Sequence, residues 1–310
     1  MGGSREQLRS GYLEYDQYVV AILIGNVQRP TMQYDDETLR RLQLAQLAIL
    51  KDIDSLCSRH GITYFLDSGT VLGAVRHGGF IPWDDDVDIA MLRPDYDRFL
   101  ALAGEGAMGE GYTICSPDVE DRWSGMFAKV WKKGTKFYTE ETIEGGIPQG
   151  IFVDIFPYDV VCSDDADARR QMSRCRTWQS ISYLYHAKTL VVPHRGLLGA
   201  LEKGLCSVAH QIVRRLFKPE RIRASFECAA RAAANQQDRS YYADMAYTKA
   251  GACPRSILVP PRPLEFEGCS FPGPADPIAY LRYMYGETWS ELPPEDRRRN
   301  HAPVELDFGE

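Results

Sequence analysis

The chain has 310 residues, which is enough for one large domain or two modest ones with a buried core. Its 44% hydrophobic and 25% charged residues are ordinary for a soluble globular protein. The net charge of −7 argues against broad binding to the phosphates of nucleic acid. We therefore expect a soluble protein whose partners do not include nucleic acid.

The cysteines and the N-terminal segment indicate where the protein works. Eight cysteines are scattered and no two form a CxxC pair, so a zinc ribbon or a thioredoxin-type site lacks support. The apolar run Val19–Ile24 is short and follows acidic residues, unlike a signal peptide, and no run approaches the roughly 20 apolar residues of a membrane span. We expect free thiols in a cytoplasmic protein, at most peripheral at the inner membrane surface, with residues 1–35 as an N-terminal extension.

The first clear element is a helix over residues 36–60. Leucines such as Leu42 and Leu50 follow helical spacing, and acidic residues open the segment, where they favour the positive end of the helix dipole. Gly61 is a typical residue just after a helix C-terminus. The β-rich run Ile62–Leu66 that follows predicts a short strand.

A glycine-containing turn comes next, at Ser68-Gly69-Thr70, and opens a short helix over Val71–His77. Glycine permits a close approach of the backbone, and a helix N-terminus favours phosphate oxygens. The Ser68 and Thr70 hydroxyls can cap the helix or contact a nucleotide. Taken alone, such a turn is more often structural than functional.

The acidic run after this helix carries the strongest chemical signal. Asp86 and Asp88 are two residues apart on a predicted strand, so they share one face, whereas Asp85 points the other way. Carboxylate oxygens on one face suit Mg²⁺ or Mn²⁺ carrying a nucleotide phosphate. An EF-hand loop is excluded because Ile89 stands where that loop needs glycine. A solvated acidic turn is the remaining alternative.

Further elements follow along the chain. A helix is expected over Asp95–Ala103, strands over Tyr112–Cys115 and Met126–Trp131, and Thr135–Thr139 is a candidate hairpin partner of the second strand. Near the end, residues 264–273 predict a hairpin, and Pro277–Tyr285 predicts a helix ended by glycine.

The run Gly150–Pro157 predicts a buried central strand, because its apolar residues are interrupted by one carboxylate, Asp154. A buried carboxylate is costly unless it is paired or bound to metal. Beside the pair Asp86 and Asp88, we interpret Asp154 as the third metal ligand and one of three candidate catalytic residues. The alternative is an aspartate that caps a neighbouring loop.

Residues 164–240 are predicted to be mostly helical, with helices over about 165–190, 196–217 and 220–237. The segment Val213–Arg223 combines five basic residues with apolar ones, and such a stretch can contact an anionic membrane surface. A solvated helix face is the favoured alternative.

Three cations are candidates for contacting the substrate: Arg76, His77 and Lys129. Cations near an acidic core can stabilise charge on a transferring phosphoryl group. Salt bridges to the aspartates are an equal alternative for each. A further histidine, His301, lies far along the chain, and nothing in the local pattern places it in the site.

The segments Leu66–His77, Ile81–Ile89 and Phe152–Asp159 closely resemble the signature of the LicD family, which includes fukutin and fukutin-related protein. Shorter similarities continue through Tyr280-Leu281 to Asn300-His301. The order and spacing are similar from about residue 40 to residue 301. No zinc-ligand cysteine cluster like that of the animal relatives is evident.

The resemblance implies an α/β fold of the nucleotidyltransferase type, a mixed sheet flanked by helices, with the catalytic domain over residues 36–310. A helical insertion and a small C-terminal hairpin-helix region complete it. It also implies metal-dependent transfer of a phospho-alcohol, with phosphocholine favoured, from a CDP-activated donor such as CDP-choline. The acceptor is a sugar hydroxyl of a glycan, teichoic acid or lipid-linked lipopolysaccharide precursor, and CMP is released.

Two alternatives remain. The same fold could transfer a nucleotidyl group and release pyrophosphate. The chain could also be an inactive nucleotide- or glycan-binding module, although three clustered carboxylates argue against a pure binder.

Overall fold

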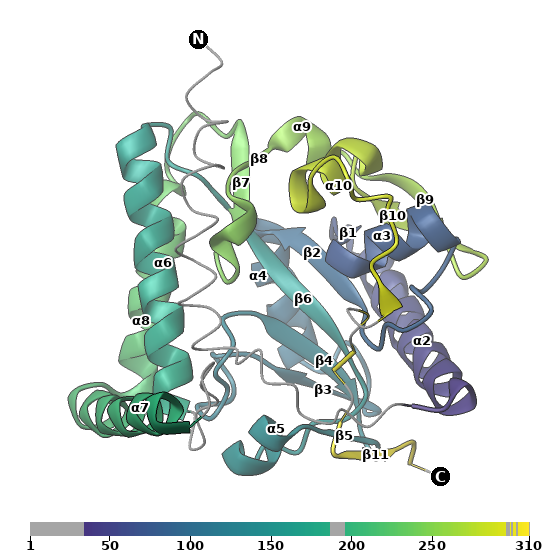
Figure 1. The fold of residues 1–310 in the computed structure, drawn as a ribbon. Coiled ribbons are helices and arrows are strands. Elements are labelled where there is room, and N and C mark those ends of the chain that lie inside the picture. Colours follow the sequence, from purple (N-terminus) through teal and green to yellow (C-terminus); the bar gives the residue numbers. More distant parts are fainter. Residues whose placement is uncertain (1–33, 187–195, 296–297, 299, 302, 310) are drawn as a thin grey trace.

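A mixed seven-stranded sheet forms the centre of the protein (Figure 1). The computed structural model describes residues 34–186, 196–295, 298, 300, 301 and 303–309. The strands of this sheet are β1 (Phe65–Leu66), β2 (Asp88–Leu92), β3 (Tyr112–Cys115), β4 (Ala128–Lys132), β6 (Phe152–Val160), β7 (Tyr241–Asp244) and β8 (Cys253–Pro254). Their order is β1-β2-β6-β4-β3, and β7 joins β6 to β8.

Strand β6 organises the sheet. It pairs in parallel with β2, and in antiparallel fashion with β4 and, farther along, with β7. All of its residues but the last are buried, as expected for a strand covered on both faces. The predicted buried central strand and the predicted mixed sheet flanked by helices are both confirmed.

The sequence of helix α2 (Asp36–His60) explains where the helix begins, where it ends and which face is buried. The Asp35 carboxylate accepts a hydrogen bond from the Thr38 amide at 2.7 Å and caps the N-terminus. Gly61 ends the helix with a φ of 59°, which glycine adopts without strain. The helix predicted over residues 36–60 is therefore confirmed. Its core-facing side chains include Leu42, Ile49, Leu50 and Ile53.

The remaining elements around the sheet largely agree with the predictions. The predicted C-terminal hairpin and the helix that follows it are confirmed, and Figure 1 shows them beside α3. These elements are α3 (Ser68–His77), α4 (Arg93–Gly104), α5 (Glu140–Gly145), α9 (Arg255–Leu258), α10 (Pro277–Tyr285) and the hairpin of β9 (Arg262–Phe266) and β10 (Cys269–Gly273).

One predicted pairing is wrong. Strand β5 (Lys136–Tyr138) lies inside the predicted segment, but it pairs with β11 (Glu305–Asp307) and not with β4. The side chain of Thr135 explains the change of direction, because its hydroxyl accepts from the Ile151 amide at 2.9 Å and donates to the Lys132 carbonyl at 2.7 Å. These bonds tie the turn to the start of β6 and direct β5 away from β4.

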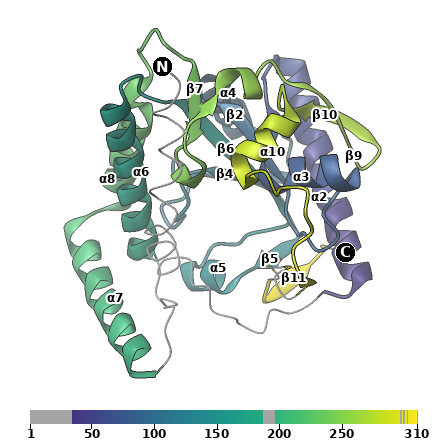
Figure 2. The same ribbon diagram turned by 45° about the horizontal axis from the view of Figure 1, so that its top comes forward.

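Three helices make up the region predicted to be helical: α6 (Asp165–His186), α7 (Gly196–Leu216) and α8 (Pro219–Ala230). Helix α8 is shorter than predicted, and a 3₁₀ turn, Arg231–Ala233, follows it. The predicted end of the first helix beyond His186, like the apolar run near residue 20, lies outside the described residues. Figures 1 and 2 show α6 and α8 packed side by side, with α7 at the periphery.

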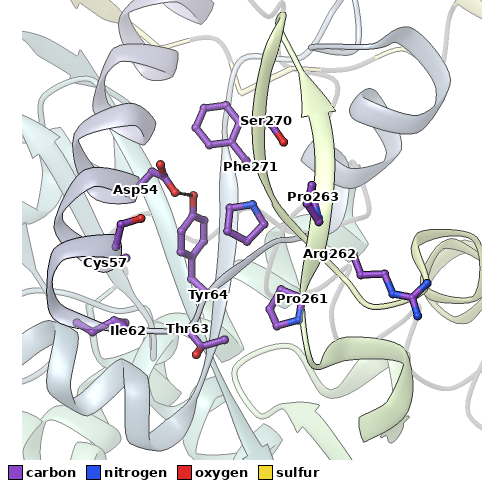
Figure 3. Close-up of a pocket in the computed structure, with 12 residues that line it drawn as sticks. Asp54, Cys57, Ile62, Thr63, Tyr64, Pro261, Arg262, Pro263, Ser270 and Phe271 are labelled. Carbon is purple, nitrogen blue, oxygen red and sulfur yellow. Dashed lines mark hydrogen bonds between the residues drawn. The ribbon is translucent and has the colours of Figure 1, made fainter.

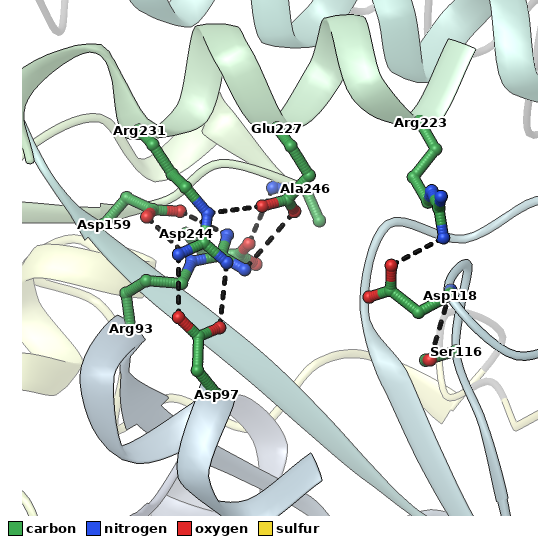
Figure 4. A network of polar contacts seen from close by, with 10 residues as sticks. All are labelled: Arg93, Asp97, Ser116, Asp118, Asp159, Arg223, Glu227, Arg231, Asp244 and Ala246. Carbon is green, nitrogen blue, oxygen red and sulfur yellow. Dashed lines mark hydrogen bonds and ion pairs between the residues drawn. The ribbon is translucent and has the colours of Figure 1, made fainter. Parts of the chain in front are cut away.

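A network of ion pairs attaches α8 to the rest of the protein (Figure 4). The Arg93 guanidinium donates to both carboxylate oxygens of Asp159 on β6, at 2.8 and 2.6 Å, and contacts Glu227 on α8 at 3.3 Å. Arg231 in turn donates to both oxygens of Asp97 at 2.7 and 2.8 Å. Since Arg93 and Asp159 are buried, loss of either partner would leave an uncompensated charge inside the protein.

Candidate active site

Three carboxylates follow one side of the segment that leads into β2. Asp84, Asp86 and Asp88 are half-buried, whereas the residues between them are buried, so exposure alternates as in a strand. The strand itself begins only at Asp88. The amide of Asp154 nevertheless donates to the carbonyl of Val87 at 2.9 Å, so the chain already runs beside β6 before β2 begins. This alternation agrees with the shared face predicted for Asp86 and Asp88.

Burial and repulsion between neighbours disfavour the charged forms of these groups. The pKa of Asp88 is raised well above its ordinary value, first by burial and then by the charges of Asp86 and Asp154. The pKa of Asp84 is raised well above its ordinary value by burial, by Asp86 and by Asp85. A cation bound among these oxygens would relieve the repulsion.

Asp154 lies in one row with residues of both neighbouring strands. It pairs with Asp88 across the parallel β2–β6 contact and with Lys129 across the antiparallel β4–β6 contact. Residues paired in this way project from the same face of a sheet, so one cation and two carboxylates stand side by side. The sequence predicted a third acid on a neighbouring strand, and the structure places it directly opposite Asp88.

Lys129 and Asp154 form a buried ion pair. The Lys129 Nζ lies 2.7 Å from Oδ1 and 2.9 Å from Oδ2, and each side chain is only 10% exposed. The ammonium also lies 3.4 Å from the centroid of the Phe152 ring, a favourable contact for a cation. Burial raises the pKa of Asp154 to about 6, although Lys129 favours the ionised form. Lys129 therefore forms a salt bridge to an aspartate, which was the alternative to a role in contacting the substrate.

The turn at Ser68-Gly69-Thr70 is occupied by contacts within the protein. The Ser68 amide donates to the Tyr280 hydroxyl at 3.0 Å, and the Thr70 amide donates to the Asp67 carbonyl at 3.0 Å. The Thr70 hydroxyl accepts from the amide of Asp88 at 2.8 Å. These contacts hold the turn against β2, and they engage amides that a phosphate would otherwise use.

Gly69 lies close to the acidic loop. A Cβ at this position would stand 3.1 Å from the Asp84 Oδ2. A side chain here would therefore press on the Asp84 carboxylate, which would have to shift, whereas glycine permits the close approach of the turn.

Arg76 and His77 lie at the other end of α3, roughly 12 Å along the helix axis from Ser68. Arg76 donates to His77 at 3.0 Å and to the carbonyl of Glu291 at 3.2 Å. The pKa of His77 is lowered by burial and by the neighbouring guanidinium. The contacts seen for this pair thus join α3 to the C-terminal region.

Comparison with known proteins decides what this domain is. A family model described as the LicD/FKTN/FKRP nucleotidyltransferase domain matches residues 61–195, which contain every predicted site residue from Ser68 to Asp154. Residues 61–195 therefore form a LicD-family domain.

Several curated relatives match parts of the chain. It is 39% identical over 124 residues to the lipopolysaccharide cholinephosphotransferase LicD of Haemophilus influenzae, covering 40% of this chain and 45% of the relative. It is 34% identical over 122 residues to an uncharacterized protein of Rickettsia prowazekii, covering 37% and 44%. It is 45% identical over 47 residues to the human ribitol 5-phosphate transferase FKRP, covering 15% and 10%. The chain thus spans less than half the length of each of these relatives.

The structure brings residues from outside the matched LicD segment to its acids. The amide of His301 donates to both Asp85 carboxylate oxygens, at 2.8 and 3.0 Å, and its Nδ1 lies 3.4 Å from Asp86 Oδ2. The bond to Asp85 and the charge of Asp86 raise the pKa of His301 to about 10. Asp85 is fully buried and also accepts from the Tyr34 hydroxyl at 3.0 Å. Asp85 thus ties two distant segments, around Tyr34 and His301, to the acidic run, a role that its side-chain direction alone did not predict.

A second buried carboxylate, Asp67, holds the turn at Ser68-Gly69-Thr70 in place. Its Oδ1 accepts from the hydroxyls of Tyr158, at 3.1 Å, and of Tyr280 on α10. Tyr280 also receives the Ser68 amide, so it joins Asp67 to the turn. Ser68 has a φ of 45°, a conformation that non-glycine residues adopt only when their surroundings impose it.

Two surface cavities lie away from this site. One, of about 320 Å³, lies between α2 and the β9–β10 hairpin and is lined by Tyr64, Pro261 and Phe271 (Figure 3). The other, of about 650 Å³, lies between the end of α4 and strand β3, beside Tyr112. Neither is lined by a predicted site residue of the LicD domain.

The donor atoms of the site fit a hard divalent cation in kind. They are carboxylate oxygens, and the buried Oδ1 of Asp154 has no hydrogen-bond partner, because Lys129 approaches it outside hydrogen-bonding geometry. Within the described ranges, however, no three Asp, Glu, His or Cys side chains meet closely enough to hold one ion. The structure therefore shows suitable ligands near one another but not a completed metal centre.

Proposed function

We propose that the chain transfers a phospho-alcohol from a CDP-activated donor to a sugar hydroxyl and releases CMP. The family match supports this, as do the names of two relatives, a cholinephosphotransferase and a ribitol 5-phosphate transferase. Phosphocholine is the favoured group, because the match to the cholinephosphotransferase extends over 124 residues and that to the ribitol 5-phosphate transferase over 47. The proposed acceptor is a glycan, such as a lipopolysaccharide precursor or a teichoic acid.

The observation that carries the proposal is the pairing of Asp88 with Asp154, with Asp86 two residues before β2. A donor diphosphate is negatively charged, and three carboxylates alone would repel it. We propose that these three aspartates hold Mg²⁺ or Mn²⁺, which would neutralise diphosphate charge when bound.

The side chains around the acids have distinct proposed roles. Lys129 supplies a buried positive charge beside Asp154, where charge develops on the leaving group. The exposed side of Ser68 and Gly69 contacts the donor, while the buried Thr70 fixes β2 through its bond to the Asp88 amide. Arg76 and His77, at the far end of α3, remain candidates for contacting more distant parts of the substrates.

The reaction forms one bond and breaks one. The oxygen of the acceptor hydroxyl attacks the phosphorus that bears the alcohol, and the bond from that phosphorus to the CMP oxygen breaks. The hydroxyl proton passes to a carboxylate of the cluster, with Asp154 as one candidate, and CMP leaves with the electron pair of the broken bond. Positioning and charge neutralisation supply most of the catalysis in such transfers.

Nucleotidyl transfer is the second candidate, because the matching model is described as a nucleotidyltransferase domain. The two reactions differ in their products. We expect CMP when the protein is incubated with acceptor glycan and one of CDP-choline, CDP-ethanolamine, CDP-glycerol or CDP-ribitol. Pyrophosphate release from CTP, with the nucleotide left on the acceptor, would instead support the second candidate.

A further inference from the structure

Helix α7 carries apolar side chains on two different faces. One face packs on α6, where Val213 and His210 are buried and the His210 Nδ1 lies 2.7 Å from the Leu184 carbonyl oxygen. The other face, which we call the outer stripe, points to solvent. Its members lie three or four residues apart and are between 51% and 64% exposed. The outer stripe consists of Leu205, Val208, Ile212 and Leu216.

Such a row is not ordinary surface composition. Single exposed apolar residues are common, but four large ones aligned along one helix form a contiguous patch of the kind that binds a partner or a membrane. The helix is also well placed for contact with an extended surface. Figures 1 and 2 show α7 at the periphery, below α6 and α8 in both views and away from the central strands β2 and β6.

Positive charge is concentrated beside the outer stripe. Residues 213–223 contain five basic residues and one acidic residue, Glu220, in a chain whose net charge is −7. Arg223 is held by Asp118 at 2.6 Å (Figure 4). The other four basic side chains are exposed. They are Arg214, Arg215, Lys218 and Arg221.

The structure separates the cations of this segment from the exposed apolar surface. The predicted break between two helices falls inside Val213–Arg223, since α7 ends at Leu216 and α8 begins at Pro219. Its apolar residues Val213 and Ile222 are buried in the protein. Val213–Arg223 therefore supplies the exposed cations. The exposed apolar surface is the outer stripe of α7.

We propose that the outer stripe of α7 binds the surface of an anionic phospholipid membrane. The helix would lie in the plane of the interface, with its exposed apolar side chains at the acyl boundary. The four exposed cations, two in its last turn and two just after it, would pair with lipid phosphates. Among the described helices, none has the length and apolar content needed to cross a membrane. Contact with the surface requires neither, and it is independent of the proposed transfer reaction.

Vesicle flotation with the full chain tests this proposal. We expect the protein to float with vesicles of phosphatidylcholine and phosphatidylglycerol, and not with phosphatidylcholine alone. Replacing two members of the stripe, Ile212→Ser with Leu216→Ser, should weaken vesicle binding at least about tenfold. Each substitution removes a large apolar side chain that would be buried in the membrane interface. The matched control is Val119→Ser, which replaces another exposed apolar residue, 68% exposed and outside α7.

The charge contribution has its own variant and control. Arg214→Glu with Arg215→Glu should also weaken binding to anionic vesicles, whereas Lys51→Glu with Arg59→Glu, two exposed cations on α2, should not. Circular dichroism checks that each variant is folded.

Three results would overturn the proposal. The first is absence of binding by the wild-type protein, and the second is equal binding by the Ile212→Ser/Leu216→Ser variant. The third is a concentration-dependent dimer in light scattering that this variant abolishes, without vesicle binding, because a second copy of the chain would then cover the stripe.

Discussion

Asp88 and Asp154 stand directly opposite each other on the parallel strands β2 and β6, but their electrostatic surroundings differ. Asp154 has a cation, Lys129, at 2.7 Å on its other side. Asp88 has mainly acids around it, and Asp86 and Asp154 are the two whose charges most strongly disfavour its ionised form. These two aspartates share one proposed function. Substituting them should nevertheless change the stability of the fold in opposite directions.

Asp88→Asn should increase stability and abolish transfer. Asparagine fills the same space without a charge, so repulsion within the acidic cluster decreases. A gain of about 1 kcal/mol would raise the melting temperature by roughly 2–4 °C in a domain of this size. Thermal unfolding without added metal measures the first effect. A lower melting temperature would show that Asp88 is stabilised by a partner that its surroundings do not indicate.

Asp154→Asn should abolish transfer but decrease stability. It leaves the Lys129 ammonium buried without its counter-charge, which typically costs about 3 kcal/mol or more. Urea unfolding of Asp154→Asn, Lys129→Met and the double variant forms a double-mutant cycle. The double variant should be more stable than Asp154→Asn alone. Simple additivity of the two losses would contradict the ion pair as the cause.

Tyr280→Phe tests whether α10 holds the turn of the LicD domain in place. The substitution keeps the ring but removes the hydroxyl that receives the Ser68 amide at 3.0 Å and donates to Asp67. The Ser68 amide would lose its acceptor and Asp67 would keep only the hydroxyl of Tyr158 as a tyrosine donor, which should cost about 1–3 kcal/mol of stability. Because the turn adjoins the acids, we also expect a lower kcat. Tyr283→Phe is the matched control and should leave kcat unchanged. The Tyr283 hydroxyl donates to the Gly251 carbonyl at 2.8 Å, away from the turn.

The features that sequence could predict are those set by neighbouring residues. Helix α2 was predictable because its capping aspartate, its leucine spacing and its terminal glycine are all local. The buried strand around Asp154 was predictable because its apolar run is continuous. For the same reason, alternation along one strand was sufficient to separate Asp85 from the face of Asp86 and Asp88.

The features that the sequence could not predict depend on contacts between distant segments. His301 reaches Asp85 across 216 residues, and Tyr280 reaches Asp67 across 213. Neither contact has a local pattern. The pairing of β5 with the C-terminal strand β11 was missed for the same reason, since proximity in sequence favoured β4 as its partner. The occupied amide of Ser68 likewise depends on a distant residue, because its acceptor is the hydroxyl of Tyr280 on α10.

Asp244 should make stability fall as the pH rises. It is half-buried at the end of β7, accepts from the Ala246 amide at 2.8 Å, and faces the charges of Asp67 and Asp159. Burial and these charges raise its pKa from 3.8 to about 8. Between about pH 4 and about pH 8 the folded protein therefore holds a proton that the unfolded chain has lost, so the free energy of unfolding decreases across this window.

The variant Asp244→Asn isolates this effect, because the amide oxygen can still accept from Ala246 but cannot ionise. Its melting temperature should exceed that of the wild type near the upper end of the window and match it near the lower end. Differential scanning calorimetry at several pH values measures the difference. A difference that does not depend on pH would contradict a raised pKa for Asp244.

The proposed function requires that the paired acids Asp86 and Asp88, with Asp154, catalyse transfer of a phospho-alcohol. The most direct measurement is transfer of label from CDP-[¹⁴C-choline] to an acceptor glycan, with CMP quantified, in the presence of Mg²⁺ or of a chelator. We predict one CMP per labelled group, loss of both products with chelator, and loss of both in Asp86→Asn but not in the exposed control Asp121→Asn. Full metal-dependent transfer by Asp86→Asn would contradict the assignment of the site, and pyrophosphate release from CTP without CMP from any CDP-alcohol would contradict the reaction.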